Sequence, residues 1–266
     1  MFFARESRLT QLGFRFGRNG PHAARTMMLG DLQILFSGVP ADAGKAAYSE
    51  EVVANNLLGK PTKKVRELAF RHLGTLYGLQ PSLAVFRVFR RFWTLDEAAR
   101  PVLALLVALA RDPLLRSTQE FVRAKHMGDA VLRDDLVALL AANHRDRFSP
   151  ASLISFAQNV NGTWTQAGFL AGHSHKARAT PVVTPIAVAF ALFLGHLEGL
   201  SGQRLFASSW TKLLGAPKDV LEAQTSAASH RGLLVFMHTG GVKEVRFPGY
   251  LSAQEEKIRQ EASGVV

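Results

Sequence analysis

The pattern of hydrophobic and polar positions is helical over the middle of the chain. Across residues 49–142 apolar side chains recur three and four positions apart, as at Val65, Leu68 and Ala69. This spacing places them on one face of an α-helix that packs against a core. The connections between successive helical segments are short. We therefore predict an all-helical domain over residues 49–145.

The pattern changes toward the C-terminus. Leu233, Val235 and Met237 alternate along the chain with Leu234, Phe236 and His238, and a Thr-Gly-Gly turn follows. Val242, Val245 and Phe247 then lie in a returning segment. A period of two around such a turn is typical of a β-hairpin. Small helices before a hairpin form the order of a winged helix, so we predict such a domain over 146–250, with 208–214 or 217–229 as its recognition helix.

The two ends of the chain have a different character. Residues 1–48 contain arginines and turn-forming glycines, and we predict that this basic segment packs on the first domain. Residues 251–266 are polar and are predicted to form a fraying tail. The expected fold class is mainly α, a two-domain helical protein with a C-terminal winged-helix-like β-hairpin.

Charge is the strongest compositional signal. The chain has 32 lysine and arginine residues against 21 acidic ones, a formal charge of +11. Such an excess favours a polyanionic partner, above all double-stranded DNA, through counterion release. The alternative is a basic protein that has no such partner. The apolar runs 101–110 and 186–195 are about half as long as a membrane span, so we expect a cytoplasmic protein that does not enter a membrane.

The candidate DNA contacts are basic residues in four places and two amide side chains. Cations at a helix start oppose the helix dipole but suit a bound phosphate, and Asn or Gln can pair with adenine. Alternatively, the helical residues belong to solvated faces, and the hairpin charges discourage edge pairing. The candidates are Lys60, Lys63, Lys64, Arg66, Arg87, Arg91, Asn159, Gln166, Lys176, Arg178, Lys243 and Arg246.

Signatures of catalysis and cofactor binding are missing from the sequence. It has no cysteine, no glycine-rich phosphate loop ending in Lys-Ser or Lys-Thr, and no GxSxG motif. The close pair His173 and His175 has no further ligands with the spacing of a zinc site. We therefore expect a protein that is not an enzyme, without a metal or another cofactor.

Several segments together resemble one protein family. NNLLGKPTKKVRELAFRHLGTLYGL, FRVFRRFW and LLVALARDPLLR, followed by SPASLISFAQNVNGTWTQAGFL, are similar to segments of the BrxA family of bacterial BREX phage-defence systems. The resemblance covers roughly residues 50–170, and residues 1–48 have no counterpart in it. It implies a small helical protein that binds double-stranded DNA and works with the other subunits of the defence system. It supplies no catalytic residues.

Two other functions follow from the same composition. The first is a scaffold whose basic face docks an acidic partner protein within the defence complex. The second is an unrecognised nuclease, which would need acidic residues that converge near a basic cleft. The adjacent pairs Asp134-Asp135 and Glu50-Glu51 do not supply them, because neighbouring helical residues point in different directions.

Overall fold

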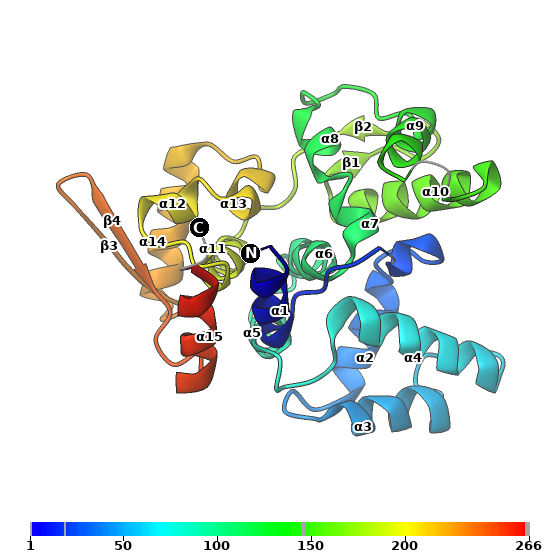
Figure 1. The fold of residues 1–266 in the computed structure, drawn as a ribbon, viewed down its shortest axis with the longest axis horizontal. Helices are drawn as coiled ribbons and strands as arrows, with labels where there is room; N and C mark the ends of the chain where they lie inside the picture. The colour runs from blue at the N-terminus through cyan, green and yellow to red at the C-terminus, as the bar shows by residue number, and fades with distance from the viewer. Residues whose placement is uncertain (1, 19, 145–146, 264–266) are drawn as a thin grey trace. The chain divides into compact units, whose positions relative to one another are not determined.

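The computed structural model describes residues 2–18, 20–144 and 147–263. Over these residues the protein is mainly α-helical, with two small antiparallel hairpins (Figure 1). The predicted fold class is therefore confirmed. The described chain forms two compact units, and each is assembled from separate stretches of sequence.

Unit 1 comprises residues 1–15, 83–106 and 181–266, and unit 2 comprises 16–82 and 107–180. This division differs from the sequential domains that the sequence predicts. The predicted N-terminal segment contributes to both units, and a boundary falls inside one buried apolar helix, α6 (Arg100–Arg111). A continuous buried helix has no break in composition, so the sequence carries no signal there.

The core of unit 1 surrounds α11 (Pro185–Leu197), whose residues 186–194 are all fully buried. Apolar side chains on every face make this helix a central element. Thr184 begins it, because its hydroxyl accepts a hydrogen bond from the Ala187 N–H at 3.2 Å. The helices that pack against it are α5 (Ala84–Trp93), α12 (Gln203–Phe206), α13 (Ser209–Leu213) and α14 (Lys218–His230). Unit 1 also contains α1 (Phe2–Leu12) and α15 (Ala253–Ser263).

The predicted β-hairpin is present in unit 1. Strand β3 (Val235–Thr239) pairs with β4 (Val242–Arg246), with Thr239 opposite Val242. Gly240 and Gly241 form the turn and both have positive φ angles, 59° and 82°. A two-residue hairpin turn requires this backbone conformation, and glycine adopts it without strain.

The predicted fraying tail is wrong over residues 253–263, which form α15 and pack against α1. The helix begins with a capping box. The Glu255 N–H donates to the Ser252 hydroxyl at 3.2 Å, and the Ser252 N–H donates to the Glu255 carboxylate at 2.8 Å. Arg8 of α1 adds an ion pair with Glu261 at 3.4 Å.

Unit 2 contains the remaining helices and a short hairpin of two strands, β1 (Leu170–Ala171) and β2 (Ala177–Arg178). Helix α10 packs against α9, β1 and η1. Thr62 and Ser149 cap α4 and α10, because each hydroxyl accepts a backbone N–H of the first helical turn. The helices are η1 (Pro21–Ala23), α2 (Leu29–Gly38), α3 (Lys45–Ser49), the π-helix η2 (Glu50–Ala54), α4 (Lys63–Tyr77), α7 (Pro113–Arg116), α8 (Gln119–Ala124), α9 (Arg133–Asn143) and α10 (Pro150–Gln166).

Candidate nucleic-acid interface

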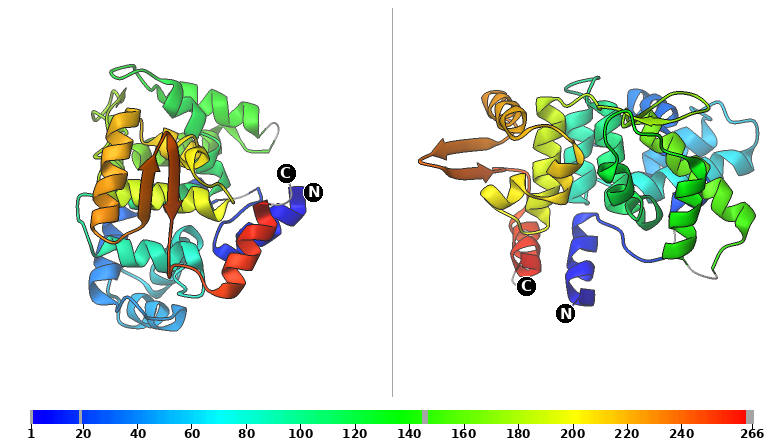
Figure 2. Two further views of the ribbon diagram at one scale, coloured as in Figure 1. Left: turned by 90° about the vertical axis from the view of Figure 1, so that its left-hand side faces the viewer. Right: turned by 90° about the horizontal axis from the view of Figure 1, so that it is seen from above.

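The C-terminal part of unit 1 has the arrangement of a winged helix. Helices α13 and α14 are joined by a turn, both contact α11, and the β3–β4 hairpin follows α14 and lies beside it (Figure 2). Ser208 caps α13 by accepting the Thr211 N–H at 3.2 Å, and Gly215 ends that segment with a φ of 65°. In this order of elements the second helix is the one that enters the major groove.

Helix α14 has a clear inner and outer face. Leu221, Thr225 and Ala228 are buried and point inward. Ala223 is exposed and Gln224 half-buried, so the middle of the outer face carries a small and a polar side chain that let a ligand approach closely, while Val220 is exposed one turn earlier. Exposed cations lie on α14 and in the neighbouring segments, at Arg204, Lys212, Lys218 and Arg231.

Lys243 does not have the phosphate-contacting position that the sequence predicts. Its side chain is only 3% exposed and forms an ion pair with Glu222 of α14. The ammonium also lies 4.7 Å from the centre of the Phe206 ring. The hydrogen bond from Lys243 holds the pKa of Glu222 below its usual value. Lys243 therefore links the wing to α14, and its ammonium is not exposed to solvent.

The rest of the wing is exposed and partly apolar. Arg246 has a 59% exposed side chain and pairs with Glu244 at 3.0 Å. Val242 is 72% exposed and Met237 is 44% exposed. Of the two predicted phosphate contacts on this hairpin, only Arg246 is therefore accessible.

The two arginines predicted on α5 have different environments. The Arg87 guanidinium donates to both carboxylate oxygens of Glu255, at 2.7 and 2.9 Å, and to the Tyr250 carbonyl at 3.1 Å. It therefore holds α15 against α5. Arg91 remains exposed and lies 5.0 Å from the centre of the Tyr250 ring.

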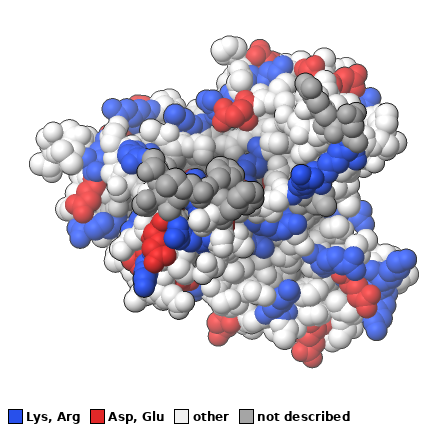
Figure 3. Space-filling model, in the orientation of Figure 1, with Lys and Arg blue, Asp and Glu red and all other residues white. Residues whose placement is uncertain are grey.

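The predicted basic cluster at the start of α4 is divided. Lys63 and Lys64 are exposed, whereas Lys60 pairs with Asp31 at 2.7 Å. Arg66 is half-buried and donates to the Ala54 carbonyl at 3.3 Å. Figure 3 shows Lys and Arg side chains over the right-hand end of α4, with acidic side chains between them. Two free lysines therefore remain from a predicted group of four.

The predicted base-contacting amides of α10 differ in how accessible they are. The Asn159 side chain is half-buried and donates to the His22 carbonyl at 3.0 Å, which leaves it little freedom to pair with a base. Gln166 is exposed and lines a 450 Å³ pocket that also includes Arg25 and Lys60. The structure thus brings Lys60 and Gln166 together, which their sequence positions did not indicate.

The two predicted cations after α10 also differ. Arg178 is only 4% exposed and donates to the Phe169 carbonyl at 3.0 Å and to the Ala179 carbonyl. Burial lowers the pKa of this guanidinium. Arg178 therefore does not have the phosphate-contacting position predicted for it. Lys176 is half-buried, and its ammonium donates to the Gly172 carbonyl at the rim of another pocket.

A buried chain of polar side chains in unit 2 was not predicted. The Nδ1 and Nε2 atoms of His22 each lie 2.8 Å from a partner, Asp112 and Thr163 respectively. Burial alone would raise the pKa of Asp112, but the hydrogen bond and charge of His22 lower it. The order Asp-His-Thr resembles a nucleophilic triad, yet all three residues have no exposed surface. Because Thr163 also accepts the Met27 N–H at 2.8 Å, the chain links segments of the core.

No group of three or more metal-ligating side chains occurs in the described part of the chain. Among the helices over residues 2–18, 20–144 and 147–263, none has the length and apolar character needed to cross a bilayer.

Comparisons with known proteins define the fold alone. No family model matches the sequence, and no curated protein matches it. The chain is similar to a solved structure of SspB, with a TM-score of 0.55 and 11% sequence identity. The match covers 97% of this chain and 100% of that one. The resemblance to the BrxA family therefore stays a prediction.

Proposed function

We propose that this protein binds double-stranded DNA through the winged helix of unit 1. In this proposal it acts as a non-enzymatic accessory subunit of a BREX-type anti-phage defence system. The observation that carries the DNA-binding part is α14 itself, which follows α13 and precedes the hairpin while its outer face carries only small and polar side chains near its middle. The place in a defence system rests on the family resemblance.

The contacts are proposed to be mainly with phosphates. Helix α14 would lie in the major groove, where Gln224 could reach base edges. Lys212, Lys218 and Arg231 are exposed in and beside α13 and α14, and the formal charge of +11 favours association. Arg246 would reach the backbone from the wing. Lys63 and Lys64 of unit 2 form a second candidate phosphate-binding patch.

A salt series with a labelled duplex tests this proposal. We expect log K to fall linearly with log salt, because cations are released from each neutralised phosphate. The triple variant Lys212→Ala, Lys218→Ala and Arg231→Ala should flatten that slope by about 2.7, since each contact contributes about 0.9.

The control removes the same charge elsewhere. The variant Lys45→Ala, Arg123→Ala and Lys257→Ala changes three exposed cations that belong to neither α13, α14 nor the wing, and should keep the wild-type slope. Equal slopes for the wild type and for the α13–α14 variant would remove the winged helix from the proposal. Scrambled-sequence competitor DNA measures any sequence preference, which we expect to be slight.

The alternative is a basic scaffold that docks an acidic partner protein of the defence complex. The wing favours it, because exposed Val242 and Met237 resemble the apolar and methionine side chains of protein interfaces. Binding to DNA that is feeble at moderate salt, together with partner binding that is lost in a Met237→Ser and Val242→Ser variant, would establish the scaffold instead.

A further inference from the structure

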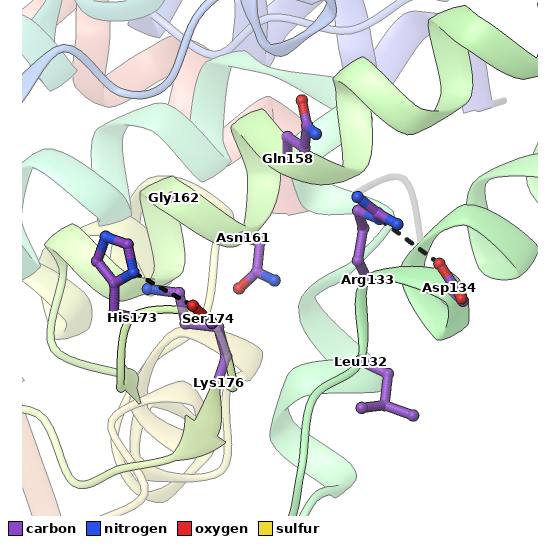
Figure 4. A pocket seen from close by; sticks show the side chains of 9 residues that line it. All are labelled: Leu132, Arg133, Asp134, Gln158, Asn161, Gly162, His173, Ser174 and Lys176. Carbon is purple, nitrogen blue, oxygen red and sulfur yellow. Dashed lines mark hydrogen bonds and ion pairs between the residues drawn. The ribbon is translucent and has the colours of Figure 1, made fainter.

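Unit 2 contains an open pocket of 480 Å³ that the proposed DNA contacts do not explain. Three elements line it: the first residues of α9, one face of α10 and the loop between β1 and β2 (Figure 4). A pocket of about 300–1,000 Å³ suits a small organic ligand. The side chains that the argument uses are Arg133, Gln158, Asn161, His173, Ser174 and Lys176.

Backbone pairing brings these distant residues together. The Val131 N–H donates to the Lys176 carbonyl at 2.8 Å, which places the start of α9 beside the β1–β2 loop. Gly172 makes the loop tight, because it has a φ of 101° and a Cβ there would lie 2.1 Å from the His175 carbonyl oxygen. Gln158 and Asn161 are three residues apart and therefore share a face of α10.

The pocket has an excess of positive charge. Arg133 lies on one side of Asn161, and Lys176 and His173 lie on the other (Figure 4). The acid Asp134 also lines the pocket and pairs with Arg133 at 3.5 Å, but its side chain is 86% exposed, and Lys176 on the other side of Asn161 has no acidic partner among the lining residues. A lysine ammonium has three donors, and the Gly172 carbonyl occupies one of those of Lys176. These groups suit a phosphate.

One atom in the wall lacks a partner. The Oδ1 atom of Asn161 is buried and accepts no hydrogen bond from any described residue. An unsatisfied buried acceptor is costly, so it marks a place where a ligand donor would be favourable. Figure 4 shows the Asn161 side chain extending from α10 into the space between the cations.

We propose that this pocket binds a nucleoside monophosphate, either free or at the end of a DNA strand. Arg133, Lys176 and His173 would hold the phosphate, with the Ser174 hydroxyl as a further donor. The Asn161 and Gln158 amides would pair with the base, and amides of this kind match the donor and acceptor edge of adenine. This site is separate from the winged helix and does not depend on the proposed function.

Calorimetric titration of the full chain tests the assignment, with AMP as the probe. AMP should bind at least about tenfold more tightly than adenosine or inorganic phosphate, a difference of about 1.4 kcal/mol. A single-stranded oligonucleotide with and without a 5′-phosphate then distinguishes a free nucleotide from a strand end. Preference for the phosphorylated oligonucleotide over AMP would assign the strand end.

Variants of the lining residues test whether AMP binds in this pocket. The double variant Arg133→Glu and Lys176→Glu should bind AMP at least about tenfold more weakly than the wild type. Asn161→Asp, which keeps the shape of the side chain, should weaken AMP binding by a similar factor. Lys45→Glu reverses an exposed charge outside the pocket and should leave AMP binding unchanged. Circular dichroism confirms that each variant folds.

Two results would overturn the proposal: AMP binding retained in the Arg133→Glu and Lys176→Glu variant, or inorganic phosphate that binds as tightly as AMP. The salt slope for duplex DNA should be the same in Asn161→Asp and in the wild type. Loss of AMP binding with an unchanged slope therefore separates this pocket from the winged helix.

Discussion

The imidazole of His22 and the carboxylate of Asp112 lie 2.8 Å apart in the core of unit 2, and neither residue has any exposed surface. Asp112 also accepts the His22 N–H at 2.9 Å and caps α7 through the Leu114 N–H at 2.9 Å. One carboxylate therefore satisfies donors from two segments that are 90 residues apart in the sequence. A buried polar group with this many partners is stabilising only while all of them remain.

Replacement of Asp112 tests this dependence. Asp112→Ala leaves the His22 and Leu114 donors buried without their acceptor, and should lower the free energy of unfolding by about 3–5 kcal/mol. Urea denaturation at neutral pH measures the change. Asp42→Ala removes an exposed carboxylate and should stay within about 0.5 kcal/mol of the wild type. A similar small change in Asp112→Ala would show that the network adds nothing to stability.

Gly20 depends on the same carboxylate. A Cβ at Gly20 would lie 1.7 Å from Asp112 Oδ1, so the carboxylate would have to move and lose its partners. Gly20→Ala should therefore destabilise the protein by more than about 1 kcal/mol. Gly74 is inside α4 and its Cβ would meet no atom within 4 Å, so Gly74→Ala should stabilise the helix by about 0.5–1 kcal/mol. Thermal unfolding of the two variants should shift in opposite directions, and shifts of the same sign would contradict both expectations.

His196 gives the stability of unit 1 a pH dependence. Burial, aided by the charge of Arg259 and opposed by that of Glu256, lowers the pKa of His196 to about 4. The unfolded chain takes up this proton near pH 6.5, while the folded protein does so only near pH 4. Stability should therefore fall as the pH decreases from about 6.5 to 4, with a slope of up to about 1.4 kcal/mol per pH unit from this group.

The variant His196→Gln isolates that contribution, because glutamine has no titrating group. Urea denaturation from pH 7 to pH 4 should give a shallower decline in the variant than in the wild type. His72 and His144, whose pKa values burial also lowers, contribute equally to both proteins. Parallel curves would mean that His196 is already accessible to protons in the folded state.

The sequence predicts the individual helices and strands of this fold better than it predicts which of them pack together. Helix caps at Thr62 and Ser149 and the Gly-Gly hairpin turn are local signals, and all three features are present. The Ser-Ala-Gln-Glu capping box at residues 252–255 was an equally local signal of α15 that the polar composition concealed. Which segments form each unit depends on long-range packing, and a local pattern does not encode it.

The candidate site could be predicted only in part, because a charged side chain has the same local pattern whether it is exposed or paired. Arg178 and Lys243 appear as surface cations in the sequence, yet carbonyl groups and Glu222 surround them in the fold. The phase of β4 gave a usable signal for Lys243. It lies two residues before the buried Val245, so it belongs to the inward face of the strand.

The ion pair between Lys243 and Glu222 leads to the last prediction, which separates a structural cation from a phosphate contact. Lys243→Met keeps the aliphatic stem over Phe206 but leaves Glu222 without its donor, and should lower the free energy of unfolding by about 1–3 kcal/mol. Arg246→Ala, on the same strand, removes a mainly exposed cation and should stay within about 0.5 kcal/mol.

In duplex binding we expect the reverse: Arg246→Ala should change the salt dependence more than Lys243→Met does. Arg246→Ala should reduce the slope of log K against log salt by about 0.9, the value for one phosphate contact, while Lys243→Met leaves that slope unchanged. Lys243→Met should still weaken binding, because the wing loses its connection to α14. A flattened slope in Lys243→Met would mean that the lysine leaves Glu222 when DNA binds, and would return it to the set of phosphate contacts.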